Sequence, residues 1–311
     1  AAISGSGPGT VAAVGTIMIP AMAQHGYDKD FSAAVSASGG TLGILIPPSN
    51  PMIIYGVLAS VSIGDMFVAG IVPGLLMGGL LMLTAVIISR RRGYRSETSV
   101  LEGETVQRAL TDGFFSLLTP FVILGGIYLG IFTPVEAAVA AIVYALFVGV
   151  VIKRSIGFAG VWQALSETSA ICGGLVLIMG TAILFGEHLA LEQVPQRLAA
   201  AMLTVTTDAT MMLLLIGAFL VVLGTFMETL STVIILTPIL LPLVKQLGVD
   251  PIHFGIILVV ASEIGFLTPP LGVNLFVACN ISGLSLEAVA RAVFPFIVVM
   301  IFALIAVILL P

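Results

Sequence analysis

Long apolar stretches separated by short polar connections constrain this chain more than any other feature. They run over residues 66–89, 114–132, 137–152, 210–226 and 288–310. A hydrocarbon core roughly 30 Å thick needs about 20 mostly apolar residues per helical crossing. Because 59% of the residues are apolar and only 9% are charged, water is not the main solvent of this chain. The sequence predicts an all-α protein that crosses a membrane several times.

The few ionisable groups exclude several classes of function. The formal net charge is -5, and the sequence lacks the excess of basic residues that would bind a nucleic acid. Cys172 and Cys279 lie in apolar runs without metal-ligand spacing, which indicates small core residues and no disulfide. The histidines fall in expected aqueous connections, and no serine in a membrane segment has a histidine or aspartate partner at its depth. We therefore expect no enzyme activity.

The chain contains an internal repeat with a fixed offset. Residues 43–48 (Gly-Ile-Leu-Ile-Pro-Pro) recur at residues 265–270 (Gly-Phe-Leu-Thr-Pro-Pro), 222 positions later. The same offset pairs Thr10 with Thr232, Pro20 with Pro242, Gly26 with Gly248, Asp28 with Asp250 and Pro73 with Pro295. Chance does not keep so many turn residues in one register. Long apolar stretches precede only the second copy, so we expect roughly a hundred residues of the first copy to be missing before Ala1.

The basic residues indicate that the two copies are inverted relative to each other. Lys and Arg occur in the connections at 25–31, 90–95 and 153–154, which the positive-inside rule assigns to the cytoplasm. Counting crossings from these connections places nine of the 11 Lys and Arg residues in the cytoplasm. Inverted repeats with interrupted helices are typical of secondary transporters, whose sites lie near the bilayer midplane.

The two Pro-Pro pairs break membrane helices at matched positions. Each pair removes two backbone donors. The carbonyls expected to lose their helical partners are those of Gly43, Ile44, Gly265 and Phe266. Such backbone is tolerated at membrane depth only inside the protein or beside a water-filled cavity. Clustered carbonyl oxygens of this kind suit a dehydrated sodium ion, and simple proline kinks satisfied by water are the alternative.

Two segments rich in glycine and hydroxyl groups, 4–10 and 224–232, interrupt the apolar sequence ahead of the breaks. Both fit the tips of re-entrant helical hairpins, and an ordinary surface loop is the alternative. A helix that starts at such a tip directs its free N–H groups and positive dipole end at the midplane, where they favour a carboxylate. We expect a carboxylate substrate between the tips and sodium where each tip meets a break.

These segments define the candidate site residues. The substrate-binding candidates are Ser4, Ser6, Asn50, Thr229 and Asn274. The first sodium site is expected to comprise Ser4, Gly5, Gly43, Pro47 and Asn50. The second sodium site is expected to comprise Glu228, Thr229, Gly265, Thr268, Pro269 and Asn274.

Three acids lie at or near membrane depth, where each needs a partner, a proton or a cavity. Glu228, at the second tip, is the one expected near an ion. Glu263 either contributes to the binding site or only stabilises the broken helix structurally. Glu136 lies at a helix start, where a first-turn acid is favoured for structural reasons. His188 is interpreted as an interfacial residue and not as a metal ligand.

Four separated motifs lie at residues 4–22, 39–49, 118–137 and 265–276, in an order that covers essentially the whole chain. Together they resemble the large membrane subunit, DctM/SiaM-like, of tripartite ATP-independent periplasmic (TRAP) transporters. The resemblance implies sodium-coupled uptake of an organic acid, such as a sialic acid or a dicarboxylate, across the bacterial inner membrane. It also implies two partners, a small four-helix membrane subunit and a periplasmic substrate-binding protein.

The resemblance further implies an elevator mechanism, in which a transport domain moves against a scaffold. Residues 1–66 of the first copy and 209–287 of the second are expected to form the transport domain. Residues 67–208 and 288–311 are expected to form mainly scaffold. Na+ is the expected coupling ion, without any cofactor. The alternatives are a carboxylate carrier of related fold that is coupled to Na+ or H+ and needs no binding protein, and a passive channel.

Overall fold

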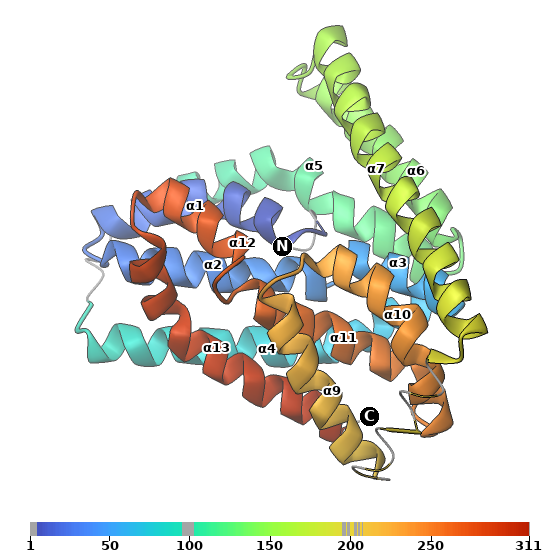
Figure 1. Ribbon diagram of the computed structural model, residues 1–311. Helices are drawn as coiled ribbons and strands as arrows, with labels where there is room; N and C mark the ends of the chain where they lie inside the picture. Colours follow the sequence, from blue (N-terminus) through green and yellow to red (C-terminus); the bar gives the residue numbers. More distant parts are fainter. Residues whose placement is uncertain are drawn as a thin grey trace. The chain divides into compact units, whose positions relative to one another are not determined.

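The computed structural model describes residues 5–94, 103–194 and 208–310, together with positions 197, 200, 201, 204 and 206. All regular structure in these residues is helical (Figure 1), which confirms the predicted all-α class. Helices long and apolar enough to cross a membrane are found at Lys29–Ala59, Ile63–Arg91, Pro134–Ile152, Phe158–Leu189, Thr229–Gln246 and Leu286–Leu309.

The helices follow the order of the repeat. The first copy forms α1 (Gly7–Gln24), α2 (Lys29–Leu45), α3 (Asn50–Ala59) and α4 (Ile63–Arg91). The middle of the chain forms α5 (Gly103–Tyr128), α6 (Pro134–Leu146), the π-helix η1 (Phe147–Ile152) and α7 (Phe158–Leu191). The second copy forms α9 (Ala209–Gly224), α10 (Thr229–Gln246), α11 (Pro251–Phe266), α12 (Val273–Ser282) and α13 (Leu286–Leu309). The chain divides into two compact units, Ala1–Glu97 with Gly186–Pro311, and Thr98–Phe185.

The offset of 222 residues found in the sequence also relates helix boundaries. α1 and α10 begin and end at equivalent positions. Their equivalent N-cap residues, Ser6 and Glu228, each accept a hydrogen bond from the backbone N–H three residues on. Gly26 and Gly248 follow the two helices with positive φ angles of 82° and 72°, which only glycine adopts without strain. The two copies therefore fold into the same succession of elements.

The first halves of the two broken helices, α2 and α11, lie in the core of the larger unit. α11 is buried without interruption from Phe254 to Phe266, as expected of a helix that is apolar on every side. The second halves are exchanged between the copies, because α3 packs against α10 while α12 packs against α1 and α2 (Figure 1). This exchange brings residues that follow one break to the tip helix of the other copy.

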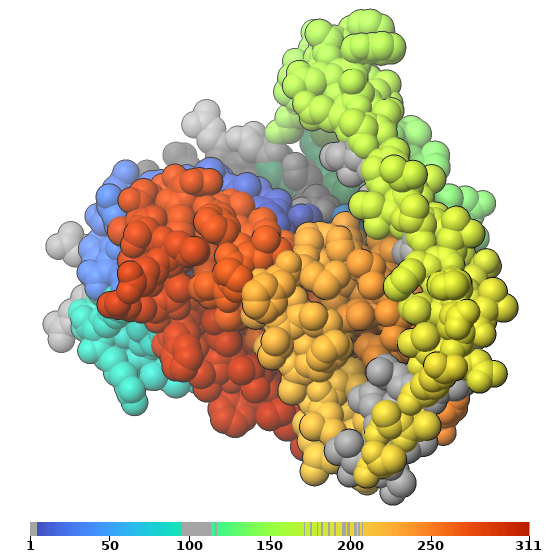
Figure 2. Space-filling model, in the orientation of Figure 1, coloured from blue at the N-terminus to red at the C-terminus, as the bar shows by residue number. Residues whose placement is uncertain are grey.

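Two further helices of this unit, α4 and α13, present apolar side chains to the outside. Val72 on α4 is 73% exposed and Phe302 on α13 is 65% exposed. α13 also packs against α9, and their surfaces adjoin in Figure 2, in red and gold. Exposed apolar faces of this extent suit a helix whose solvent is hydrocarbon and not water.

In the second unit, α6 begins with a reciprocal cap. Thr133 Oγ1 accepts the Glu136 N–H, and Glu136 Oε2 accepts the Thr133 N–H at 2.8 Å. This capping box confirms the structural interpretation of Glu136. The expectation that both cysteines are core residues is wrong for Cys172, which is exposed, while Cys279 is half-buried. An apolar sequence does not identify a core here, because in a membrane an apolar residue can equally face lipid.

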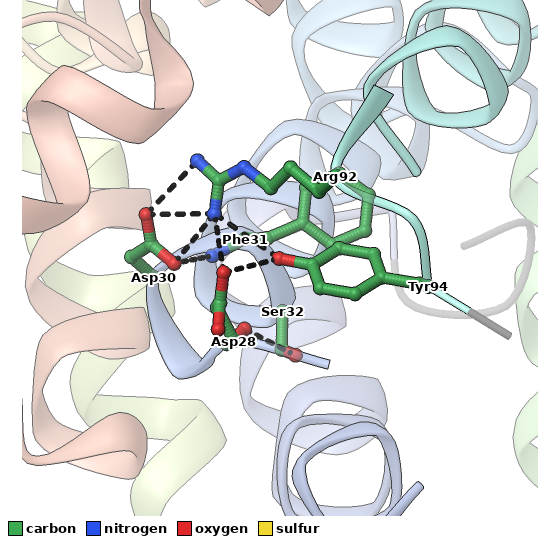
Figure 3. A network of polar contacts seen from close by, with 6 residues as sticks. All are labelled: Asp28, Asp30, Phe31, Ser32, Arg92 and Tyr94. Carbon is green, nitrogen blue, oxygen red and sulfur yellow. Dashed lines mark hydrogen bonds and ion pairs between the residues drawn. The ribbon is translucent and has the colours of Figure 1, made fainter. Parts of the chain in front are cut away.

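A polar network joins the start of α2 to the end of α4 (Figure 3). The Arg92 guanidinium donates to Asp28 Oδ2 at 3.0 Å and to both carboxylate oxygens of Asp30 at 3.0–3.2 Å. Tyr94 Oη donates to Asp28 Oδ2 at 2.5 Å, and the guanidinium lies 5.9 Å from the centroid of the Phe31 ring. Two connections that were both expected in the cytoplasm, 25–31 and 90–95, are therefore held together.

The contribution of this network to the stability of the folded protein should decrease at acidic pH. The hydrogen bond from Tyr94, followed by the bond and charge of Arg92, lowers the pKa of Asp28 below its usual 3.8. A carboxylate with a lowered folded-state pKa stabilises the protein above its unfolded pKa and loses that effect as the pH falls through the folded value. We therefore expect Arg92→Met to lower the melting temperature at pH 7, by a difference that begins to shrink below about pH 5 and shrinks further as the pH falls below 3.8.

Thermal unfolding in detergent across this pH range measures the difference. Arg91→Met is the matched control, because Arg91 forms no ion pair within the described residues. An Arg92→Met deficit that stays constant from pH 7 to pH 3 would contradict the role given to Asp28.

Candidate functional site

The first tip packs directly against the first break. Gly5 has a φ of +58° and approaches so closely that a Cβ atom there would lie 3.1 Å from the Pro48 carbonyl oxygen and 3.2 Å from Asn50 Oδ1. A Cβ atom on Gly43 would lie 3.0 Å from the Ser6 carbonyl oxygen. The structure thus brings together four of the residues predicted for substrate or for the first sodium ion. Pro47 is buried in the break itself, and Ser4 lies outside the described residues.

Helix α1 starts at this tip, so its N-terminal N–H groups lie beside the break. The Ser6 side chain caps it by accepting the Gly9 N–H at 3.3 Å. In the described part of the chain, the Gly43 carbonyl has no backbone donor, because its helical partner would be the N–H that Pro47 lacks. The first junction therefore combines a helix N-terminus with an unpaired carbonyl oxygen.

The second tip packs against the second break in an equivalent way. A Cβ atom on Gly265 would lie 2.5 Å from backbone atoms of Gly224, so the two glycines allow α9 and α11 to touch. The Leu271 N–H donates to the Thr225 carbonyl oxygen at 3.0 Å. These contacts fix the end of α9 and the turn after it on the break.

One expectation about the second break is wrong. The Gly265 carbonyl is not left without a donor, because it accepts the Thr268 N–H at 2.8 Å. Thr268 Oγ1 also donates to the Ile264 carbonyl at 2.8 Å. The reason is that Thr268 precedes the proline pair, so its N–H can close a tighter last turn of the 3₁₀ type. Pro269, which follows it, is exposed.

The two acids at the second tip occupy different surroundings. Glu228, the acid expected near an ion, is exposed, and its Oε2 caps α10 by accepting the Ser231 N–H at 3.2 Å. Glu263 is only 2% exposed, and its Oε1 accepts the Thr229 hydroxyl at 2.6 Å. The acid that lies inside the junction is therefore Glu263, which is joined directly to the first residue of α10.

Asn274 is the most unusual side chain of the site. It is completely buried, and neither Oδ1 nor Nδ2 has a hydrogen-bond partner among the described residues. Although it follows the second break, it lies on the first tip, because a Cβ atom on Gly7 would be 3.0 Å from its Oδ1 and 3.2 Å from its Nδ2. Leaving a buried polar group unpaired costs about 1–3 kcal/mol. Such a group is normally explained by a bound ion, water or ligand.

Comparison with known proteins identifies the family of this chain. A sequence model described as "Tripartite ATP-independent periplasmic transporter, DctM component" matches residues 1–311. The chain belongs to the DctM family. This family membership confirms the resemblance found in the sequence.

Individual relatives of this DctM-family chain are TRAP transporter permeases. The isethionate permease protein DctMQ of Oleidesulfovibrio alaskensis is 46% identical over 96% of this chain, which spans 47% of that relative. The C4-dicarboxylate large permease protein DctM of Pseudomonas aeruginosa is 41% identical over 100% of this chain and 73% of its own length. The sialic acid large permease protein SiaM of Vibrio cholerae is 38% identical over 95% of this chain and 69% of its own length.

Two glycines that make close contacts at this candidate site were not identified from the sequence. Gly40 was not among the candidates, yet a Cβ atom there would lie 3.0 Å from the Gly7 carbonyl oxygen and 3.5 Å from Asn274 Nδ2. Gly224 was also missed. Both belong to pairs of small residues that let helices approach closely, and that signal is visible in the sequence as Gly39-Gly40 and as the Gly224 that precedes the second tip.

Proposed function

We propose that this chain carries the substrate and ion sites of a TRAP-type large permease that takes up an organic acid together with sodium across the bacterial inner membrane. The observation that carries the proposal is the Asn274 amide, buried without partners against the N-terminus of α1. Its Nδ2 can donate to an anionic oxygen, which the positive dipole end of α1 also favours. Its Oδ1 can accept from the substrate or contact a cation.

Sodium would bind at the two junctions. The first offers the unpaired carbonyl of Gly43, the backbone of Gly5 and the amide of Asn50. The second offers Thr229 with Gly265 and the turn around Thr268. Carbonyl, hydroxyl and amide oxygens of this kind can replace the water around a dehydrated monovalent cation.

An elevator movement is the mechanism we propose for the loaded site. Two observations support an inverted repeat: the two copies have equivalent elements, and α3 and α12 are exchanged between them. In such a repeat the tips and breaks would move as one body. Residues 1–66 and 209–287 would form that body, while 67–208 and 288–311 would be mainly scaffold. The contacts of α2 and α11 with α4 and α13 are then among those across which the movement must take place.

The substrate is proposed to be a small organic anion, with a carboxylate, or a sulfonate as in isethionate, as the recognised group. The named relatives carry isethionate, C4-dicarboxylates and sialic acid in their descriptions, and each of these presents negatively charged oxygens. The description of the family as tripartite and periplasmic supports two partners. We propose a small four-helix membrane subunit and a soluble periplasmic protein that delivers the substrate.

Uptake by the full-length permease in proteoliposomes tests the proposal. The permease would be reconstituted with its small subunit, and binding protein would be added with labelled isethionate, succinate or sialic acid under an inward sodium or potassium gradient. We expect uptake of one of these acids only with sodium and only with the binding protein. Full uptake with potassium would contradict sodium coupling. Equal uptake of free substrate would favour a carrier that needs no binding protein.

A further inference from the structure

The second junction contains a buried acid that the sodium sites described above do not include. We propose that the Glu263 carboxylate is itself a cation ligand, and that it supplies the charge that makes this junction bind sodium. The inference rests on the proposed sodium-coupled uptake and adds a residue and a charge to the second site. Glu263 lies on α11 in a stretch that is buried from Phe254 to Phe266.

The contacts of Glu263 leave half of the carboxylate unsatisfied. Oε1 accepts the Thr229 hydroxyl at 2.6 Å, whereas Oε2 is buried and has no hydrogen-bond partner in the part of the chain that the structure describes. A carboxylate oxygen has two lone-pair directions and is costly to bury without a donor or a cation. The unsatisfied oxygen is therefore available for a ligand within the junction.

Among the described residues, no lysine, arginine or histidine side chain forms an ion pair with this carboxylate. The ion pairs found there join Arg92 to Asp28 and Asp30, and Arg291 to Glu287, and none reaches Glu263. The charged or titratable residues on the helices packed against α11 are Lys29, Asp30, Tyr55, Asp65, Arg90, Arg91, Lys245, Glu287 and Arg291, and Glu228 caps one of these helices. None of them forms a hydrogen bond or ion pair with Glu263 in the described part of the chain.

The surroundings supply further oxygens of the type that sodium prefers. Thr229 begins α10, and its hydroxyl oxygen lies against the carboxylate. The backbone at the end of α9 lies close by, because a Cβ atom on Gly224 would be 2.9 Å from the carbonyl oxygen of Ser262, the residue before Glu263. Hydroxyl and carbonyl oxygens beside a carboxylate form a site for a hard cation.

The equivalent position of the first copy shows that this charge is specific to the second junction. Thr41 lies 222 residues before Glu263, and its hydroxyl donates to the Ser38 carbonyl at 2.7 Å. Gly7 stands in the place of Thr229. The first junction therefore has no ionisable group at this position, whereas the second has a carboxyl group that carries one negative charge when it is ionised. A sodium ion at the second junction would neutralise that charge, and binding there should depend on it.

Replacing Glu263 by glutamine removes the charge and keeps the shape. We expect Glu263→Gln to raise the sodium concentration for half-maximal uptake at least tenfold in the reconstituted system. The substrate concentration for half-maximal uptake, measured at saturating sodium, should change by less than twofold. Glu287→Gln is the matched control, because it removes an equally negative but exposed carboxylate, and its sodium dependence should match the wild type. A Glu263→Gln variant with wild-type sodium dependence overturns the proposal.

A melting experiment keeps the inference testable if Glu263→Gln does not transport. In detergent, the wild type should melt higher in sodium than in potassium, and Glu263→Gln should lose most of that difference while melting in potassium at least as high as the wild type. A variant with the full sodium response overturns the role of Glu263 alone. A wild type without any sodium response overturns the proposed sodium coupling instead, so the two failures are distinguishable.

Discussion

Replacing Asn274 by leucine is expected to reduce uptake strongly while leaving the sodium-free subunit at least as stable as the wild type. Leucine has nearly the same shape as asparagine but no polar atom, so it removes the cost of about 1–3 kcal/mol for burying an unpaired amide. It also removes the donor and acceptor offered to the ligand. Hydrogen bonds to charged groups contribute about 1.5–3 kcal/mol, so uptake should fall by about tenfold to a hundredfold.

Uptake in proteoliposomes and thermal unfolding in potassium buffer measure the two effects. Asn280→Leu is the matched control, because Asn280 lies on the same helix but is exposed, and it should transport normally. Wild-type uptake by Asn274→Leu would contradict the assignment of the site. A strongly destabilised Asn274→Leu variant would mean that the amide has a structural partner.

Gly265→Ala should be the most destabilising single-methyl change in the site. The added Cβ atom would lie 2.5 Å from the Cα and carbonyl carbon of Gly224 and from the Val221 carbonyl oxygen. These are backbone atoms that cannot rotate away, so α9 must separate from α11. Overpacking of this kind costs about 3 kcal/mol, which corresponds to a melting temperature lower by roughly 6–10 °C. Uptake should also be lost, because separating α9 from α11 disrupts the second junction.

Gly39→Ala provides the comparison for this prediction. Gly39 also lies in the first half of a broken helix, but a Cβ atom there would meet no heavy atom within 4 Å. Alanine favours a helix over glycine by about 1 kcal/mol, so this variant should be as stable as the wild type or slightly more stable. Differential scanning fluorimetry in detergent distinguishes the two, and equal melting temperatures for both variants would contradict the close packing of the second junction.

Much of this fold could be predicted because its determinants are local in the sequence. Apolar stretches set the helical class, and the proline pairs at 47–48 and 269–270 fix where two helices end. The capping acid Glu136 was recognisable because a capping box needs only residues four positions apart or fewer. The repeat was visible for the same reason, since each copy keeps its own turns and caps.

The arrangement of the site could not be predicted in the same way. Asn274 follows the second break in the sequence but lies on the first tip, because α12 packs against the helices of the other copy. Which acid is buried also depends on packing between helices, so Glu228 and Glu263 could not be told apart by depth alone. The donor to the Gly265 carbonyl was missed because a proline pair identifies lost helical bonds but not the tighter turn that replaces them.

The most direct test is the melting temperature of the full-length permease in detergent, with sodium titrated against potassium at constant ionic strength. A ligand that binds only the folded state stabilises it by RT ln(1 + [L]/Kd), or about 2.7 kcal/mol at a hundredfold excess over Kd. We expect a rise that is selective for sodium and is reduced in Asn50→Ala, at the first junction, and in Glu263→Gln, at the second, which would locate cation binding at the two junctions. Identical curves for sodium and potassium would contradict sodium binding at the breaks.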